Sequence, residues 1–134
     1  SGIDRQDTGL IRTLMAVDHA ANTLKMAAAV PQGSLVRMMH ADNDSLVDAA
    51  RKAAEDAGMD KSQASIVISC AGRKILMGSD VEEEIDAVLD VVGKDRPFAG
   101  FYSYGEICPY AGSGYSELHH QTMTITTFSE DKAD

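Results

Sequence analysis

The sequence has little cysteine, a shortage of basic residues and no long apolar run. Its two cysteines, Cys70 and Cys108, follow no CxxC or other metal-binding spacing, and so few suit a reducing, cytoplasmic setting. Lys and Arg number 12 against 21 Asp and Glu, and the net charge of -9 argues against nucleic acid and anionic membranes as partners. The longest apolar runs, such as residues 26–30, fall far short of the roughly 20 residues that span a bilayer.

The length and composition predict a single globular domain. The chain has 134 residues, of which 44% are hydrophobic and 25% are charged. Residues 1–9 are polar, and we expect a lead-in or an expression remnant there. The domain itself is expected over residues 10–129, and residues 130–134 form a charged, flexible tail. No charged segment followed by an apolar one opens the chain, so no secretion signal is expected.

Residues 10–40 show the patterns of three strands joined by short loops. Apolar and polar residues alternate from Leu10 to Val17, a second strand is predicted over Thr23–Ala29, and a third over Ser34–His40. Asp18–Asn22 has the composition of a hairpin loop, and Pro31–Gly33 that of a turn. Short loops between consecutive strands predict an antiparallel meander.

Two capped helices and a buried strand follow. Asp42–Ser45 is typical of a helix N-cap, and the helix behind it has a mostly alanine face and ends at Gly58. That predicted face consists of Leu46, Ala49, Ala50, Ala53 and Ala57. Ala64–Cys70, ASIVISC, is rich in β-branched residues, which indicates a buried central strand. A second helix is predicted from Ser79, with Glu82 completing a capping box and the run Glu82–Glu84 solvated in its first turn.

The remaining strands complete an α+β domain. Strands are predicted over Phe98–Tyr104 and Leu118–Phe128, separated by a tyrosine-containing, glycine-rich loop at Cys108–Glu117. The predicted order is βββ-α-β-α-β-β. We therefore expect an antiparallel or mixed sheet of about six strands with two main helices packed on it.

Polar and aromatic side chains gather in the stretch Pro97–Thr124. Glu106 stands alone between Gly105 and Ile107, where it fits a turn residue, a salt-bridge partner or a ligand contact. Arg73 also follows a predicted strand, so Arg73 and Glu106 are expected to meet at one sheet edge if their strands are neighbours. There they would either pair with each other or hold an amino acid, with Arg73 binding its carboxylate and Glu106 its ammonium group. Tyr102 and Tyr104 share a strand parity, which places their rings together in the core or on a ligand platform.

The two adjacent histidines are expected to face opposite sides of a strand, His119 inward and His120 outward. They therefore cannot chelate one metal ion together, and no metal site is expected. A haem needs one axial histidine, which leaves His119 or His120 open as a haem ligand. Cys70 with a histidine would be a conceivable nucleophile and base, but no sequence feature orients such a pair. No catalytic residue and no enzyme activity are predicted.

Three motifs resemble the C-terminal FIST domain of F-box and intracellular signal transduction proteins. They are SCAGRKILMG at Ser69–Gly78, followed by the acidic helix, then GFYSYGEICP at Gly100–Pro109 and LHHQTMTI at Leu118–Ile125. His120 stands where the family usually has Asn. The matching motif positions are Arg73, Tyr102, Tyr104, Gly105, Glu106, Pro109, His119 and Thr122.

The resemblance implies a cytoplasmic, non-enzymatic sensory module that binds a small ligand, such as an amino acid or a related metabolite. It implies ligand contacts from the motif residues Arg73, Tyr102, Tyr104, Gly105, Glu106 and His119. It also implies an N-terminal FIST domain and a downstream kinase, cyclase or chemoreceptor as partners. The alternatives are a haem-based nitric oxide sensor and a docking domain that binds protein through its tyrosine-rich loop.

Overall fold

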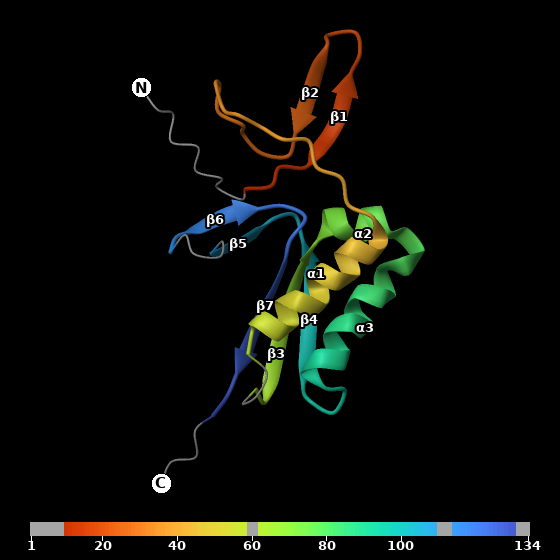
Figure 1. Cartoon of the computed structure of the whole chain (residues 1–134), viewed down its shortest axis with the longest axis vertical. Coiled ribbons are helices and arrows are strands. Elements are labelled where there is room, and N and C mark those ends of the chain that lie inside the picture. Colours follow the sequence, from red (N-terminus) through yellow and green to blue (C-terminus); the bar gives the residue numbers. More distant parts are fainter. Residues whose placement is uncertain (1–9, 59–61, 110–113, 131–134) are drawn as a thin grey trace.

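A mixed three-stranded sheet forms the centre of the fold. The computed structural model describes residues 10–58, 62–109 and 114–130. Strand β3 (Ala64–Cys70) lies between β4 (Phe98–Ser103), which runs parallel to it, and β7 (Met123–Phe128), which runs antiparallel (Figure 1). The predicted buried central strand, the mixed sheet and the α+β class are therefore confirmed.

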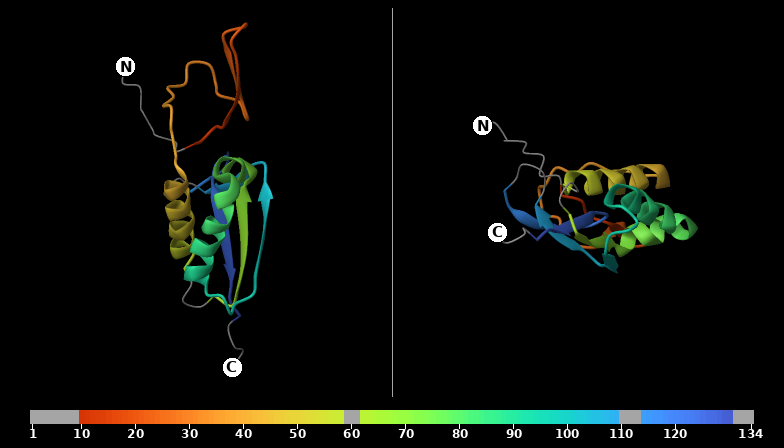
Figure 2. Two further views of the ribbon diagram at one scale, coloured as in Figure 1. Left: turned by 90° about the vertical axis from the view of Figure 1, so that its right-hand side faces the viewer. Right: turned by 90° about the horizontal axis from the view of Figure 1, so that it is seen from below.

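Two long helices cover one face of this sheet (Figure 2). They are α1 (Asn43–Asp56) and α3 (Val81–Val92), and the short α2 (Ala71–Met77) with a 3-10 helix (Gly78–Asp80) leads from β3 into α3. The core between helices and sheet consists of Ala50, Ala54, Val67, Val88 and Val92. Small alanine side chains let α1 approach the other layer closely. None of the described helices combines the length and apolar character needed to cross a membrane.

The ends of α1 match the sequence signals, whereas the start of α3 does not. The Asp42 carboxylate accepts the Ser45 backbone N–H at 2.9 Å, and bonding to Ser45 lowers the pKa of Asp42. Gly58 follows the helix with a φ of 72°. The buried face of α1 is Leu46, Ala50 and Ala54, whereas of the other alanines predicted on this face Ala53 and Ala57 are half-buried and Ala49 is exposed. No capping box forms, because α3 begins at Val81 and its N-cap side chain makes no capping hydrogen bond.

The other strands pair in two separate ribbons, so within the described residues seven strands form three small sheets instead of one sheet of about six. One ribbon is β1 (Leu14–Asp18) with β2 (Thr23–Met26), and the other is β5 (Glu106–Pro109) with β6 (Ser116–His119). The predicted turn at Asp18 is present, since its carboxylate accepts the backbone N–H groups of Ala20 and Ala21, each at 2.9 Å.

Residues 10–41 form an arm that extends beyond the sheet and helices (Figure 1). It consists of the β1–β2 hairpin and the connection from Ala27 to α1, with the predicted turn at Pro31–Gly33 in place. The predicted third strand, Ser34–His40, is wrong: these residues form no β-ladder. The segment SLVRMMH is rich in apolar residues but does not alternate, because Leu35 is followed by Val36 and Met38 by Met39, and within the described chain no strand pairs with it.

The predicted final strand, Leu118–Phe128, is divided in two. β6 ends at His119, and β7 begins at Met123. Between them Gln121 adopts a φ of 60°, which turns the backbone out of the strand conformation. We call residues 120–122 the kink. The lead-in at residues 1–9 and the end of the predicted tail, residues 131–134, lie outside the described residues.

Candidate functional site

The predicted site residues gather near one edge of the central sheet. Because β3 and β4 are parallel, their carboxyl ends, Cys70 and Ser103, meet at the same edge, and β7 begins there at Met123. Ligands of α/β sheets usually bind beyond the carboxyl ends of parallel strands. Side chains alternate along each strand, so Ser69 and Tyr102 face the helices, while Cys70 and Ser103 face the other side. Two polar clusters result.

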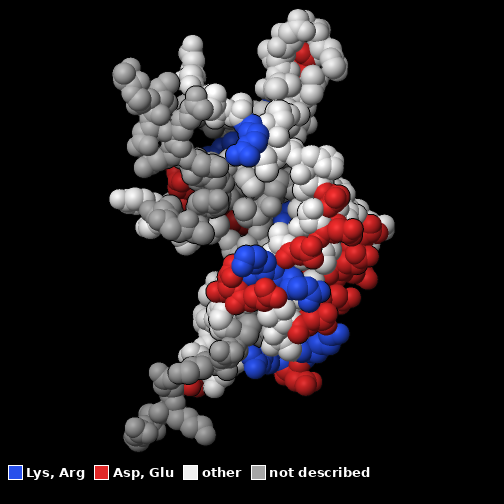
Figure 3. Space-filling view, in the orientation of Figure 1, with Lys and Arg blue, Asp and Glu red and all other residues white. Residues whose placement is uncertain are grey.

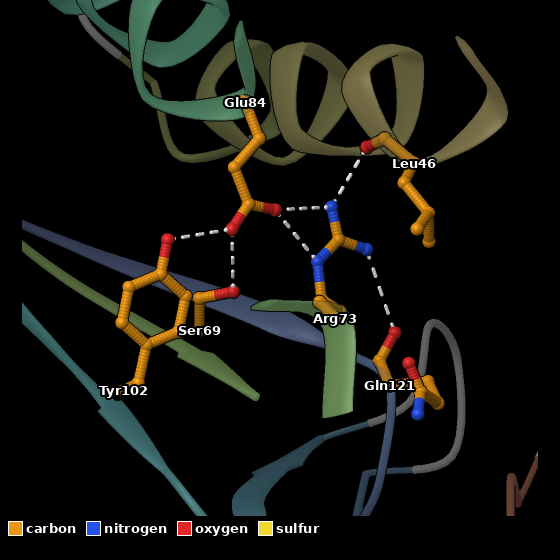
Figure 4. A network of polar contacts seen from close by, with 6 residues as sticks. All are labelled: Leu46, Ser69, Arg73, Glu84, Tyr102 and Gln121. Carbon is orange, nitrogen blue, oxygen red and sulfur yellow. Dashed lines mark hydrogen bonds and ion pairs between the residues drawn. The ribbon is translucent and has the colours of Figure 1, made fainter. Parts of the chain in front are cut away.

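The first cluster is a buried network around Arg73 and Glu84, on the helix side of the sheet (Figure 4). Arg73 lies on α2 and Glu84 on α3, and their side chains are 2% and 0% exposed. Arg73 Nε and Nη2 lie 2.9 and 2.8 Å from Glu84 Oε2. The other carboxylate oxygen accepts the hydroxyls of Ser69 and Tyr102, at 3.1 and 3.0 Å.

The guanidinium of Arg73 is satisfied on its remaining sides by backbone carbonyls. Nη2 donates to the Leu46 carbonyl of α1 at 2.7 Å, and Nη1 to the Gln121 carbonyl in the kink at 3.5 Å (Figure 4). The network therefore ties both long helices to the sheet and to the kink. Burial, together with the Glu84 carboxylate, raises the pKa of Tyr102 to about 12. Lys74 Nζ lies 5.0 Å from the centre of the Tyr102 ring.

Two sequence predictions about these charges are wrong. Glu84 was expected to be solvated with Glu82 and Glu83, but it is fully buried, because it lies one helical turn before Val88 on the buried face of α3. Arg73 was expected to follow a strand at a turn and to meet Glu106. It lies in the first turn of α2, and among the described residues its ion pair is with Glu84.

The second cluster surrounds Glu106, at the start of β5. Its Oε1 accepts the Ser103 hydroxyl at 2.7 Å, and its Oε2 accepts the Thr122 hydroxyl at 2.8 Å. His119 is its ladder partner across β5 and β6. Glu106, His119 and His120 are each at most 4% exposed. No ion pair to Glu106 is found among the described residues, and the two hydrogen bonds that its carboxylate accepts from them both come from hydroxyl groups.

The kink explains why both histidines are buried. A regular strand would direct His119 and His120 to opposite faces, as predicted, but the backbone leaves the strand after His119. The prediction that His120 points outward is therefore wrong. Two polar atoms of the kink, His120 Nδ1 and Gln121 Oε1, are buried without a hydrogen-bond partner. Unlike the Arg73–Glu84 network, this cluster has unused hydrogen-bonding capacity.

The remaining predicted residues lie around this second cluster. Gly105 passes close to β6, because an added Cβ would lie 2.8 Å from Leu118 Cδ1 and 3.6 Å from His120 Nε2. Tyr104 lies beyond the end of β4 and is 92% exposed, so it shares no core face with Tyr102. Cys70 is buried, and its backbone N–H donates to the Thr122 carbonyl at 3.0 Å. Pro109 ends β5, and Tyr110 lies outside the described residues.

Sequence reasoning missed the hydroxyl groups that hold the carboxylates. Ser69, Ser103 and Thr122 each donate to Glu84 or Glu106. Thr122 is one of the motif positions, but no ligand contact was predicted for it. The signal for Ser69 and Ser103 was available, since each is a small polar residue at the end of an otherwise apolar strand.

Among the described residues no group of three or more His, Cys, Asp or Glu side chains is arranged to hold a metal ion.

The chain matches the model of the FIST C domain over residues 1–109, which is most of its length, and it therefore belongs to this family. The family is associated with sensory domains of signal transduction. No solved structure matches the chain significantly.

Among curated proteins, the chain is similar to an uncharacterized protein of Mycobacterium tuberculosis, with 29% identity over 124 residues that cover 89% of this chain and 31% of that protein. It is also similar to an uncharacterized protein of Mycobacterium bovis, with 26% identity over 127 residues that cover 91% of this chain and 32% of that protein. The chain thus spans about a third of the length of the curated relatives it matches.

Proposed function

We propose that the chain is a non-enzymatic, cytoplasmic sensory domain that binds a small ligand bearing an ammonium group, such as an amino acid, at Glu106. One observation carries the proposal: the carboxylate is buried, receives only hydroxyl donors and has no cationic partner among the described residues. A buried carboxylate is costly unless it is paired or hydrogen-bonded. A ligand ammonium group would supply the missing charge and donate to the free lone pairs of the carboxylate.

The arm offers a route by which such binding would be signalled. Gln121 Nε2 donates to the Thr13 hydroxyl at 3.3 Å, and Arg12 Nη1 donates to the Leu118 carbonyl at 2.8 Å. Both contacts join the base of the arm to β6 and the kink, which border Glu106. In this proposal a ligand that engages Gln121 Oε1 shifts the base of the arm. A downstream kinase, cyclase or chemoreceptor, or an N-terminal FIST domain, reads the change.

Arg73 has a different part in this proposal from the one the sequence suggested. Its donors are occupied by Glu84 and by two carbonyls, so it contributes by fixing the kink and not by binding a ligand carboxylate. Tyr102 belongs to the same network. Tyr104, Gly105 and His119 remain candidate ligand contacts, together with His120, Gln121 and Thr122.

The test is a thermal-shift screen of the chain against amino acids, their des-amino analogues and haemin, followed by calorimetric titration. We expect an amino acid to raise the melting temperature and its des-amino analogue to have no effect. A ligand at 100 times its dissociation constant adds about 2.7 kcal/mol of stability. Glu106→Gln should abolish the shift, whereas Glu117→Gln, the same change on neighbouring β6, should retain it.

Other outcomes of the screen would overturn the proposal. A Soret band and a shift with haemin alone would favour the haem sensor. Silence across the panel would favour a docking domain. An amino-acid shift that survives in Glu106→Gln would place the ligand elsewhere.

A further inference from the structure

The segment that builds the Glu106 cluster contains no basic residue. From Pro97 to Asp131 the sequence has no Lys or Arg, although it has the acids Glu106, Glu117, Glu130 and Asp131. This segment supplies β4, β5, β6, the kink and β7. An anionic group of a ligand would therefore meet no counter-charge from this segment, whereas an ammonium group would meet the Glu106 carboxylate.

Two arginines from elsewhere in the chain contact β6 and the kink, and both are already engaged. The donors of Arg73 bond to Glu84 and to backbone carbonyls, one of which lies in the kink. Arg12 is half-buried and donates to backbone carbonyls, among them that of Leu118 at 2.8 Å. A ligand carboxylate that sought either arginine would have to compete with these bonds.

An unpartnered imidazole nitrogen lies beside Glu106. His120 is 4% exposed, and its Nδ1 is buried without a hydrogen-bond partner. An added Cβ on Gly105, the residue before Glu106, would lie 3.6 Å from His120 Nε2, so the imidazole packs against that glycine. Thr122, two residues after His120, donates to Glu106 itself at 2.8 Å. Buried polar atoms are normally satisfied, and this one is available to a ligand.

Gln121 brings a second unpartnered atom to the same end of the sheet. An added Cβ on Gly72 would lie 3.1 Å from Gln121 Cδ and 3.5 Å from Cys70 Sγ, so the amide and the thiol lie close together. Cys70 is the ladder partner of Ser103, which donates to Glu106 at 2.7 Å. Gln121 Oε1 is buried and has no hydrogen-bond partner, so it requires an N–H or O–H donor.

These groups discriminate between a carboxylate and a neutral amide as the second polar group of the ligand. A carboxylate has no proton to donate to Gln121 Oε1, and Glu106 would repel it. An amide in its place donates through N–H to Gln121 Oε1. It also offers either a donor or an acceptor to His120 Nδ1, whichever tautomer the imidazole adopts.

The field of the whole protein acts in the same direction. The chain has a formal net charge of -9, and the acidic side chains gather over the helices (Figure 3). A free amino acid is a zwitterion with no net charge, whereas an α-amino amide is a monovalent cation. A protein of negative net charge attracts the cation and not the zwitterion.

We propose that the Glu106 site prefers an α-amino amide to a free amino acid, with the ammonium group at Glu106 and the amide at Gln121 and His120. The inference rests on the function proposed above, ammonium binding at Glu106, and narrows the class of ligand. The amide is expected to bind about tenfold more tightly than the amino acid with the same side chain, because it gains a hydrogen bond and avoids repulsion between carboxylates.

The experiment is a calorimetric titration of the chain with a matched series of ligands. The series is leucinamide, leucine, isopentylamine, which lacks the carboxyl group, and isocaproamide, which lacks the ammonium group. At about pH 6 each α-ammonium group is charged. We expect leucinamide to bind most tightly, then isopentylamine, then leucine, and isocaproamide not to bind. The same series with alanine and phenylalanine side chains covers other sizes of ligand.

Two variants test whether the kink reads the amide. His120→Phe keeps a ring and removes Nδ1, and Gln121→Asn withdraws the amide by one methylene while placing a residue that tolerates positive φ. Each should bring the ratio of the leucinamide and isopentylamine affinities closer to one. Glu117→Gln on β6 is the control and should keep the wild-type ratio. Urea unfolding of each variant checks that it is folded.

A peptide presents the same α-amino amide at its N-terminus. Trileucine that binds as tightly as leucinamide would identify a peptide N-terminus as the source of the ligand, and weaker binding would identify a small amino amide. Both results support the preference for the amide.

The failure of this inference is distinguishable from the failure of ammonium binding. Leucine that binds as tightly as leucinamide, with both lost in Glu106→Gln, would overturn the preference and leave the proposed function standing. A chain that binds none of the amines would overturn both. A ratio that stays at the wild-type value in His120→Phe and in Gln121→Asn would show that the kink does not read the amide.

Discussion

Arg73 and Glu84 form an ion pair closed to solvent, in which two guanidinium nitrogens lie within 2.9 Å of the same carboxylate oxygen. Every polar atom of this pair has a partner. Glu106, on the other side of the sheet, is buried as well but has no cation among the described residues. The two acids thus have opposite roles: the first fixes the architecture, and the second is the group left for a ligand.

Removing the charge of Glu84 should destabilise the protein severely. Glu84→Gln leaves the Arg73 guanidinium buried without a counter-charge, and we expect a loss of about 3 kcal/mol in the free energy of unfolding, measured in urea. Glu83→Gln, one position earlier and exposed, should change it by less than about 0.5 kcal/mol. Equal effects of the two variants would contradict the buried pair.

Stability should fall at alkaline pH through Tyr102. Burial and the Glu84 carboxylate raise its pKa to about 12, above the ordinary value of 10.0 that applies in the unfolded chain. The stabilisation is complete below pH 10 and is lost as the pH rises towards 12, because the unfolded chain loses the proton first. The urea midpoint followed over this range measures the effect.

Tyr102→Phe should remove the loss of stability at alkaline pH that Tyr102 causes. Tyr104→Phe should leave that loss unchanged, because Tyr104 is exposed. A wild-type profile that is flat over the same range would refute the assignment.

Labelling of Cys108 should report the charge of Glu106. Burial, and then the Glu106 carboxylate, raise the pKa of the Cys108 thiol, so the reactive thiolate is scarce at neutral pH. We expect slow alkylation by iodoacetamide and faster alkylation in Glu106→Gln, since removing the negative charge lowers the thiol pKa. Peptide mass spectrometry separates Cys108 from Cys70.

For this measurement Glu83→Gln is the control and should leave the rate unchanged. Rapid labelling of Cys70 near neutral pH would revive the possibility of a cysteine nucleophile, which its burial disfavours. An unchanged rate in Glu106→Gln would show that the carboxylate does not act on Cys108.

Gly100 is expected to be intolerant of a side chain. It pairs with Val67 in the parallel ladder, and an added Cβ would overlap the Val67 carbonyl oxygen, which is backbone and cannot move aside freely. Gly100→Ala should cost about 2 kcal/mol of unfolding free energy. Ala99→Ser, next to it on the exposed face, should be nearly neutral, and a comparable loss there would point to the strand and not to the overlap.

The parts of the fold that local signals determine were predictable. Ala64–Cys70 is short, apolar and β-branched, which is sufficient to identify the central strand. Asp42 and Gly58 bracket α1 because their side-chain and backbone preferences act within a few residues. A resemblance to the FIST C domain followed from three motifs between Ser69 and Ile125, and membership is shown by the family match over residues 1–109.

The parts that depend on distant contacts were not predictable. The apolar residues of Ser34–His40 form a strand only if another strand is present to pair with them, and none pairs with them within the described chain. The parity argument for His119 and His120 failed at one residue, Gln121, whose positive φ carries no sequence signature in a non-glycine residue. The acid of α3 that turns inward is chosen by the position of Arg73, which is set by tertiary packing.

The place of β7 in the sheet bears on how the chain folds as it is synthesised. β7 is the last strand in the sequence, yet it hydrogen-bonds to β3 from Ala64 to Ser69, and Met123 and Ile125 pack against the core. Until Phe128 has left the ribosome, one edge of β3 is unpaired and its valine and isoleucine side chains lack part of their cover. A protein truncated after Pro109, where the family match ends, would lack β7, so one edge of β3 would stay unpaired. We expect this truncated protein to aggregate.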